Sequence, residues 1–459
     1  MYQINFSNPI HIYFIGIGGI SMSGLAEVLL EKGFSVSGSD AKPSSLTHML
    51  EQKGAVIHYG QKYENLSNGI DLAVYTSAIR PDNPEMIAAS DLHIPLLTRA
   101  QLLGQMMKNY DTPIAISGTH GKTTTTSMVS EILVTAKYDP TLSVGGILKS
   151  IGGNIRIGHS GYFFTEACEY TNSFLSFFPK IGIILNIEED HMDFFKDLDH
   201  IRNSFRQFAQ LLPDDGALII GGDISGWRDI AGTVKCPVIT FGSTPECQYS
   251  FRDVSYDEMS CATFTLVKDS VSQEQFVLSV PGEHNILNAL AAIALSDLLS
   301  IPRETVRNAL KAFTGTDRRF EYKGTVNGIT IIDDYAHHPT EITATLRAAV
   351  NYPHKTLWCV FQPHTYTRTK AFLKDFAKAL SLADQIILAE IYPARETDTL
   401  GISSRDLQKE IQALGKECHY FPTFDEIENF LLKNCINGDL LITMGAGDVL
   451  KIGENLLGI

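Results

Sequence analysis

Residues 113–126 read Pro-Ile-Ala-Ile-Ser-Gly-Thr-His-Gly-Lys-Thr-Thr-Thr-Thr and decide how the middle of this chain folds. The apolar run 113–116 predicts a buried strand, and residues 128–133 predict the start of a helix. A glycine-rich turn between a strand and a helix surrounds a phosphate with backbone N–H groups and the partial positive charge of the helix terminus. Lys122 adds a full positive charge, and the hydroxyl of Thr123 can reach a Mg²⁺ ion. The stretch therefore predicts a site for ATP or GTP.

This loop is a shortened version of the usual phosphate-binding loop. Ile116 stands where the usual spacing has a glycine, five residues before Gly121. The alternative interpretation is an ordinary helix terminus followed by a run of threonines, and it leaves the Gly-Lys-Thr order without an explanation.

Composition limits the class of protein. The 459 residues suffice for about three domains, and 44% hydrophobic with 19% charged residues is typical of a soluble globular protein. A net charge of −15 argues against nucleic-acid binding, which needs a basic surface. Seven cysteines without a C-x-x-C pair indicate neither disulfides nor a zinc site, so we expect a reducing cytoplasm. The apolar N-terminal stretch is broken by polar residues, proline and glycines, so we expect neither a signal peptide nor membrane insertion.

A second glycine-rich turn lies near the start of the chain. Residues 11–15 predict a strand, residues 16–24 contain the turn, a helix is expected from Leu25, and residues 34–38 predict a strand that ends at Asp40. A G-x-G-x-x-G reading would need a glycine where serine stands at position 21, so dinucleotide binding and simple packing are equally expected. The turn suits a diphosphate, with Asp40 placed to meet a ribose or a base.

Acidic residues follow two predicted strands of the middle region. Glu166 comes after the strand 161–165, and the segment 186–193, which contains His191, comes after the strand 181–185. A carboxylate and an imidazole beside a Lys-Thr phosphate loop can complete a Mg²⁺ shell with phosphate oxygens. For the segment 186–193 alone, a capped and solvated acidic loop is an equally good interpretation.

The last third of the chain alternates predicted strands with predicted helices, among them a helix at 370–381, which indicates another α/β unit. Residues 332–340 (Ile-Asp-Asp-Tyr-Ala-His-His-Pro-Thr) and 362–369 (Gln-Pro-His-Thr-Tyr-Thr-Arg-Thr) each follow a predicted strand. Polar residues gather at the carboxyl ends of strands in α/β sites. Arg368 is suited to clamp a carboxylate or a phosphate.

Together these motifs resemble those of the Mur ligases, the ATP-dependent amide ligases of peptidoglycan precursor synthesis. The resemblance is nearly end to end and rests on residues 15–26, 118–124, 166–170, 186–191, 284–289, 334–339 and 361–369. It implies an α/β fold of three domains: a Rossmann-like UDP-sugar-binding domain at 1–106, a P-loop ATP-binding domain with a parallel-rich sheet at 107–319, and a Rossmann-like amino-acid-binding domain at 320–459.

The resemblance also implies an activity. We expect the chain to join L-alanine to the lactyl carboxylate of UDP-N-acetylmuramate through an acyl phosphate formed from ATP, with Mg²⁺ as cofactor, in cell-wall biogenesis and hence in cell shape and division. The implied setting is the cytoplasm, as a monomer or a weak homodimer without nucleic acid.

The resemblance assigns roles position by position. The expected catalytic residues are Lys122, Glu166, His191, His337 and Arg368, and the expected Mg²⁺ ligands are Thr123, Glu166 and His191. The expected ATP-binding residues are Gly118, Thr119, His120, Gly121, Lys122, Thr123, Thr124, His284, Asn288, Arg319 and Asp334. The UDP-sugar would meet Gly16, Gly18, Gly19, Asp40 and Ser77. L-alanine would be framed by Tyr335, His337 and Arg368, with Thr365 standing where some relatives have arginine.

Four other interpretations compete. A murein-tripeptide recycling ligase would use the same sugar nucleotide, and folylpolyglutamate synthase would lack such a first domain. An NAD-dependent dehydrogenase would leave Lys122 and the cluster 334–339 unexplained. A nucleotide-gated binding protein without chemistry would not need Lys122, Glu166, His191 and Arg368 together.

Overall fold

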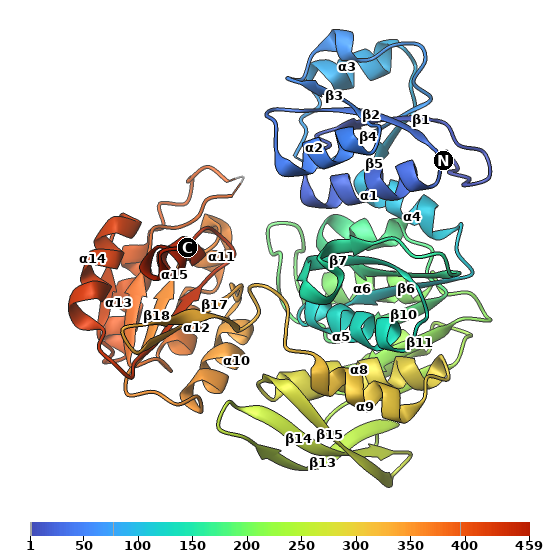
Figure 1. The fold of residues 1–459 in the computed structure, drawn as a ribbon. Helices are drawn as coiled ribbons and strands as arrows, with labels where there is room; N and C mark the ends of the chain where they lie inside the picture. The colour runs from blue at the N-terminus through green and yellow to red at the C-terminus, as the bar shows by residue number, and fades with distance from the viewer. Residues whose placement is uncertain (1, 77, 395) are drawn as a thin grey trace.

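The computed structural model describes residues 2–76, 78–394 and 396–459 and contains three sheets that follow one another along the chain (Figure 1). Each sheet carries helices, so the fold is α/β throughout, as the sequence predicted. The central sheet lies between the other two in the chain, and its loops meet both of them.

The first sheet is parallel, with the order β3-β2-β1-β4-β5. Its elements are β1 (His11–Ile15), α1 (Ile20–Glu31), β2 (Ser35–Asp40), α2 (Ser45–Gln52), β3 (Val56–Tyr59), β4 (Leu72–Tyr75), α3 (Pro84–Asp91), β5 (Leu96–Thr98) and α4 (Arg99–Met107). Helix α1 begins five residues before the expected Leu25, because its first turn is made by the glycine-rich segment itself and buries Met22.

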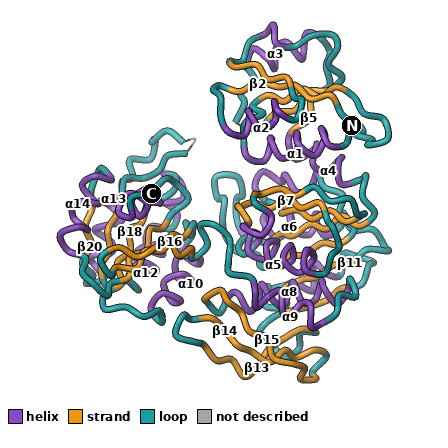
Figure 2. The backbone as a smooth tube through the Cα atoms, viewed as in Figure 1, coloured by secondary structure: helices purple, strands orange, loops and turns teal. Residues whose placement is uncertain are grey.

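The second sheet has ten strands in the order β15-β14-β13-β12-β11-β10-β6-β9-β7-β8. Its strands are β6 (Thr112–Ser117), β7 (Thr141–Leu148), β8 (Gly153–Arg156), β9 (Tyr162–Ala167), β10 (Ile181–Ile184), β11 (Ala217–Gly221), β12 (Val238–Phe241), β13 (Tyr249–Tyr256), β14 (Cys261–Lys268) and β15 (Val271–Pro281). Its helices are α5 (Lys122–Thr135), α6 (Leu198–Ala209), α7 (Trp227–Ala231), α8 (His284–Leu298) and α9 (Arg303–Ala312). The antiparallel run β13–β15, which sequence analysis did not predict, forms one edge (Figure 2).

The third sheet has the order β16-β17-β21-β18-β19-β20, with only β16 antiparallel to its neighbour. Its strands are β16 (Glu321–Val326), β17 (Ile329–Asp334), β18 (Leu357–Phe361), β19 (Gln385–Leu388), β20 (Cys418–Tyr420) and β21 (Leu440–Met444). Its helices are α10 (Pro339–Val350), α11 (Tyr366–Ala371), α12 (Leu373–Leu380), α13 (Ser404–Ala413), α14 (Phe424–Asn434) and α15 (Leu450–Leu457). The helix expected at 370–381 is two helices, because Phe372 leaves helical geometry at φ −109° and ψ 23°.

The apolar core is continuous between the first two sheets and separate in the third. One buried cluster runs from Phe14 and Val74 in the first sheet to Phe163 and Ile184 in the second. At this joint a Cβ on Gly104 of α4 would overlap the backbone carbonyl of Ser176, so the two units touch at backbone distance. The clusters on the two faces of the third sheet contain only residues from position 320 onward. Within the described chain, no helix is both long and apolar enough to span a membrane.

Candidate functional site

The phosphate loop is fixed by glycine geometry. Gly118 has φ +143° and Gly121 has φ +82°, values that side-chain-bearing residues rarely adopt. The backbone N–H of His120 donates to Oδ1 of Asn186 at 2.8 Å, which anchors the loop to the segment after β10. Because α5 begins at Lys122, the free N–H groups of its first turn face the loop. The strand, turn and helix predicted from the sequence thus form a phosphate-binding geometry.

Lys122 is held over this loop by a buried carboxylate. Its Nζ lies 3.0 Å from Oε2 of Glu169 and donates to the carbonyl oxygens of Gly118 at 2.5 Å and Thr119 at 3.0 Å. Burial opposes the charge on Lys122, but the acidic groups around it, Glu169 foremost, together outweigh burial and raise the pKa of the lysine. The ammonium group is therefore charged and preorganised above the loop.

Thr123 and Glu166 form an oxygen-donor pair beside Lys122. The Thr123 hydroxyl donates to Oε2 of Glu166 at 3.1 Å, and Oε1 of Glu166 accepts from the Gly145 N–H at 2.6 Å. Burial raises the pKa of Glu166, so this carboxylate would gain from a nearby cation. Hydroxyl and carboxylate oxygens are ligands that Mg²⁺ prefers, so this pair fits the expected ion.

His191 lies apart from that pair. Its Nε2 is 3.9 Å from Oε1 of Glu169 and 3.8 Å from Oδ2 of Asp190, and its ring stacks on Tyr170 with centroids 4.5 Å apart. Glu169 thus connects His191 to Lys122, and among the described residues His191 forms no hydrogen bond or ion pair with Thr123 or Glu166. The role of His191 as a Mg²⁺ ligand stays a prediction.

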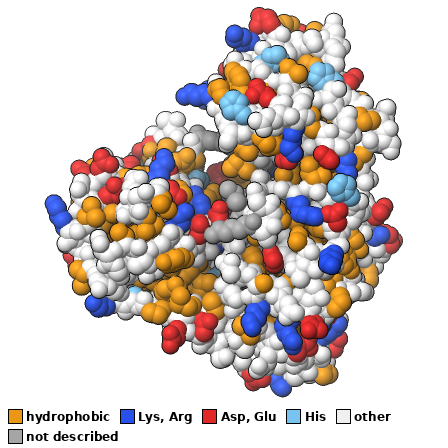
Figure 3. All heavy atoms as spheres, viewed as in Figure 1, with side chains coloured by type: hydrophobic (Ala, Val, Ile, Leu, Met, Phe, Trp, Pro, Cys, Tyr) orange, Lys and Arg blue, Asp and Glu red, His pale blue; other side chains and the backbone are white. Residues whose placement is uncertain are grey.

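A cavity of about 500 Å³ opens next to the loop, between the second and third sheets. Figure 3 shows this face of the molecule hollowed between the part that carries the third sheet and the rest. The cavity brings together seven of the residues predicted to bind ATP: His120, Gly121, Thr124, His284, Asn288, Arg319 and Asp334. Burial raises the pKa of Asp334 to about 6 against the opposing charge of Arg319, and its carboxylate accepts the N–H groups of Phe320 and Ala336 at 2.7 Å.

His120 connects the loop to the third sheet. Its Nε2 lies 3.5 Å from Oε2 of Glu188, and its Nδ1 lies 3.1 Å from Oε1 of Glu341 on α10. Burial would lower the pKa of His120, but the Glu188 and Glu341 carboxylates outweigh burial and raise it to about 9. His120 is therefore an imidazolium between two carboxylates, one from each side of the interface.

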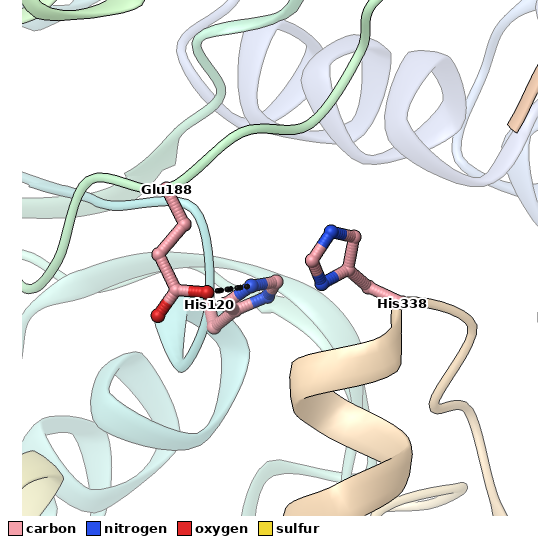
Figure 4. A group of neighbouring side chains, drawn as sticks. All are labelled: His120, Glu188 and His338. Carbon is pink, nitrogen blue, oxygen red and sulfur yellow. Dashed lines mark ion pairs between the residues drawn. The ribbon is translucent and has the colours of Figure 1, made fainter. Parts of the chain in front are cut away.

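Figure 4 shows His120, Glu188 and His338 together, and their ligand-type atoms lie within 4.8 Å of one another. This donor set does not fit a metal ion as it stands. The Thr340 N–H donates to Nδ1 of His338 at 3.3 Å, which places the proton of that neutral ring on Nε2. Both nitrogens of a charged His120 also carry protons, so neither ring offers a lone pair to an ion at this point.

Arg368 forms the centre of a second cluster, at the carboxyl ends of β17 and β18. This cluster, the Arg368 corner, contains Asp190, Tyr335, His337, His364 and Arg368. Its Nη2 lies 2.9 Å from Oδ1 of the buried Asp190, and its Nη1 lies 3.1 Å from Nδ1 of His364. Burial would raise the pKa of Asp190, but the Arg368 guanidinium together with the neighbouring histidines outweighs burial and holds this pKa well below its usual range. The pair joins the second sheet's loop to the third sheet and orients the guanidinium.

His337 completes this corner. Its ring lies 5.3 Å from the Tyr335 ring and 5.7 Å from the His364 ring, centroid to centroid. Burial lowers the pKa of His337 to about 4 and that of His364 to about 3. The structure thus brings together the three residues predicted to frame the amino acid, with His337 as a neutral imidazole beside the neutral imidazole of His364.

The N-terminal glycine turn is closed by the second strand. The N–H groups of Gly16 and Ile17 both donate to the Ser39 carbonyl oxygen at 2.9 Å, and the Gly18 N–H donates to Oδ2 of Asp40 at 2.8 Å. Gly19 is the residue before α1. These predicted sugar-nucleotide residues lie at one strand end, and the predicted Ser77 lies outside the described residues.

Several residues that contact the predicted ones were not themselves predicted, among them Glu169, Asp190, His364 and Glu341. Glu169 is three residues after Glu166, and Glu341 is four residues after His337 at the start of a predicted helix. His337 lies just before α10 and Glu341 lies in its first turn, so an acidic residue four positions after His337 at a predicted helix start was the signal available in the sequence.

These features define a class: a three-unit α/β protein with a phosphate loop whose cavity is shared between two of its sheets. Three family profiles match along the chain, described as Mur ligase family, catalytic domain (11–111), Mur ligase middle domain (116–296) and Mur ligase, glutamate ligase domain (318–447). The chain belongs to the Mur ligase family.

Full-length relatives agree with this assignment. The chain is 60% identical over 458 residues to UDP-N-acetylmuramate--L-alanine ligase of Lachnospira eligens and 58% identical over 457 residues to the ligase of the same name from Agathobacter rectalis, with 100% of both chains covered in each case. Among solved structures, UDP-N-acetylmuramate-alanine ligase of Thermotoga maritima superposes with a TM-score of 0.81 at 29% identity, covering 98% of each chain. A murein peptide ligase of Psychrobacter arcticus gives 0.72 at 27% identity, again covering 98% of each.

Proposed function

We propose that this chain joins L-alanine to the lactyl carboxylate of UDP-N-acetylmuramate with hydrolysis of ATP to ADP and phosphate. The observation that carries the proposal is the interface between the second and third sheets, where the phosphate-loop cavity and the Arg368 corner adjoin. The full-length relatives named for this reaction support the choice of substrates.

Each of the three units binds a different substrate. Residues 1–106 bind the UDP-sugar through the turn that contains Gly16, Gly18 and Gly19, with Asp40 and Ser77 beside it. Residues 107–319 bind ATP, and residues 320–459 bind the amino acid. The lactyl carboxylate and the γ-phosphate of ATP thereby meet between the first two units. The carboxylate attacks the γ-phosphate, ADP leaves and an acyl phosphate forms, while the amine enters from the third unit.

ATP occupies the cavity beside the phosphate loop. His284 and Asn288 of α8 face the adenine, Asp334 meets the ribose, and Arg319 reaches the phosphates. Lys122, supported by Glu169, neutralises charge on the β- and γ-phosphates. Thr123 and Glu166 would hold Mg²⁺, with His191 as the further ligand, and the ion would neutralise charge on the transferred phosphoryl group.

The amine step follows at the Arg368 corner. Arg368 binds the alanine carboxylate, and Tyr335 and His337 frame the amine. The ammonium group gives one proton to His337, the free amine attacks the acyl carbonyl, the C–O bond to phosphate breaks, and the second N–H proton leaves with the phosphate. Asp190 keeps the guanidinium in register for this attack.

The cytoplasm supplies ATP and sugar nucleotides, so we place the reaction there, carried out by a monomer or a weak homodimer. The product enters the assembly of the cell-wall precursor.

Phosphate release tests the proposal. The protein is given ATP, Mg²⁺ and UDP-N-acetylmuramate, with L-alanine in one arm and L-Ala-γ-D-Glu-diaminopimelate in a parallel arm. Release that depends on L-alanine is expected. Release only with the tripeptide would assign the chain to the recycling reaction, and no release in either arm would refute the choice of sugar nucleotide.

A further inference from the structure

Glu341 on α10 contacts both the phosphate loop and the Arg368 corner with one carboxylate. Oε1 lies 3.1 Å from Nδ1 of His120 in the phosphate loop. Oε2 accepts from the backbone N–H of His337 at 3.1 Å and lies 3.3 Å from Nδ1 of the same residue. The side chain is only 15% exposed, so solvent competes little for these contacts. Glu341 thus bridges two residues that lie on different sheets.

On the nucleotide side, Glu341 fixes the loop residue between Thr119 and Gly121. The adjoining backbone N–H of His120 is already anchored to Asn186, so the Glu341 contact fixes the imidazole as well. His120 and Glu341 both line the ATP cavity. A change in the Glu341 carboxylate is therefore transmitted to the wall of that cavity.

On the amine side, Glu341 fixes the tautomer of His337. Nδ1 of His337 lies 2.9 Å from the Tyr335 carbonyl oxygen and 3.3 Å from Oε2 of Glu341, and both oxygens are acceptors. Nδ1 therefore carries the hydrogen, which leaves Nε2 with the lone pair. A carboxylate behind an imidazole that receives a proton on its other nitrogen is a recurring arrangement for positioning a base.

We infer that Glu341 is a positioning residue that couples the phosphate loop to the proton-accepting nitrogen of His337. The inference rests on the proposed function, because that reaction supplies the ammonium group. In the step concerned, the N–H bond of the alanine ammonium breaks and an Nε2–H bond forms on His337, and His337 later returns that proton to solvent. Glu341 gains and loses no proton.

The charged and titratable groups around this pair set the direction of its pH response. His337 is faced by Glu341 in the first turn of the helix that follows it and by Arg368, Asp190 and His364 from the neighbouring elements. Glu341 is faced by His337, His120 and Arg319. Burial lowers the pKa of His337 and Glu341 opposes that shift, so removing the negative charge lowers the pKa of His337 further. The acid limb of the amine step then moves to lower pH, while the weaker base lowers the plateau.

The test compares Glu341→Gln and Glu341→Asp with Glu390→Gln as the matched control. Glu390 also lies in the part of the chain that carries the third sheet. Its carboxylate accepts from the Tyr420 hydroxyl at 2.6 Å and, in the described part of the chain, has no hydrogen bond to the phosphate loop or to Arg368. For Glu341→Gln we expect kcat/KM for L-alanine to fall ~10²-fold, with the acid limb shifted to lower pH. We expect ATP affinity, measured by calorimetry, to weaken several-fold. The control keeps both constants, and Glu341→Asp recovers part of the loss.

Two double-mutant cycles separate positioning from general loss of stability. Adding Glu341→Gln to His337→Gln should cost little more in kcat/KM for L-alanine, and adding it to His120→Asn should cost little more in ATP affinity. Additive losses with an unshifted pH profile, or wild-type constants in Glu341→Gln, would overturn the inference. If the wild-type protein does not use L-alanine, the proposed function fails by itself, while the ATP-affinity cycle still decides whether Glu341 acts on the loop.

Discussion

Two glycine-rich turns in this protein share a strand–turn–helix design and differ in what satisfies their N–H groups. In the first sheet the Gly18 N–H is taken by the Asp40 carboxylate, and the first turn of α1 has no charged residue. In the second sheet the loop runs into Lys122, whose Nζ is held over it by Glu169. A turn that supplies its own cation suits a triphosphate that must lose charge in the reaction. A turn that already holds an anion suits a ligand that is bound but not transferred.

Among substitutions in the two turns, Lys122→Ala should have the largest effect on turnover. We expect kcat to fall by ~10³-fold or more, because the charge on the transferred phosphoryl group loses its fixed counter-ion. The fold should persist with a lowered melting temperature, because the buried Glu169 loses its partner. Phosphate release and thermal unfolding measure the two effects. Lys235→Ala is the control, because that side chain is 80% exposed and distant from the loop. Near-normal turnover in Lys122→Ala would remove the ATP site from this loop.

Gly118→Ala and Gly19→Ala compare the two turns, because each substitution adds one methyl group to a glycine of one turn. A Cβ at Gly118 would lie 2.9 Å from Cβ of Leu185 and would require φ +143°, whereas a Cβ at Gly19 meets nothing closer than 3.6 Å at φ −65°. Strain of about 1–3 kcal/mol predicts a ~5–100-fold loss of ATP affinity in Gly118→Ala. Gly19→Ala should keep its ATP affinity and its melting temperature. Equal effects in the two variants would mean that loop geometry does not distinguish the turns.

Asp40→Asn changes the anion that the first turn already holds. Because a charged acceptor on the Gly18 N–H is replaced by a neutral one, we expect KM for UDP-N-acetylmuramate to rise ~10-fold. Steady-state kinetics with each substrate varied in turn should show an unchanged KM for ATP. A matching rise for ATP would show that the first turn also serves the nucleotide.

The smallest effect concerns pH and the contact between the second and third sheets. His120 has its pKa raised from 6.5 to about 9 by Glu188 and Glu341, with His338 beside it. The contribution of this contact to the closed arrangement is complete below pH 6.5 and is lost as pH rises through about 9. Distance measurements between dyes on the two units should show opening by a modest factor over that range. His120→Asn should abolish the pH dependence, and a change in the opposite direction would contradict the charge assignment.

The strands and turns that carry glycine or apolar runs were predictable from the sequence. The strand before Gly118 and the cluster after β17 follow from local pattern, and the structure gathers seven predicted ATP residues in one cavity. The partners of the charged residues were not predictable in this way. Glu169 under Lys122 and Asp190 against Arg368 are ion pairs that depend on how separate strand ends meet.

The antiparallel strands β13–β15 also escaped prediction, and for a different reason. Their burial alternates unevenly and the register of each pair shifts, so the period-of-two pattern is weak. The helix expected at 370–381 divides at Phe372, which packs its ring against His338 with centroids 4.8 Å apart. In both places long-range packing overrides the local signal.

The apolar core that joins the first two sheets stops before the third, whose own clusters are complete. Mutations in the apolar core of the last third of the chain are therefore separated from the apolar core of the first two sheets. Such a division lets the third unit change its specificity for the amino acid during evolution while the phosphate loop stays unchanged. A changed third unit must still form the contact of Glu341 with His120 and that of Arg368 with Asp190.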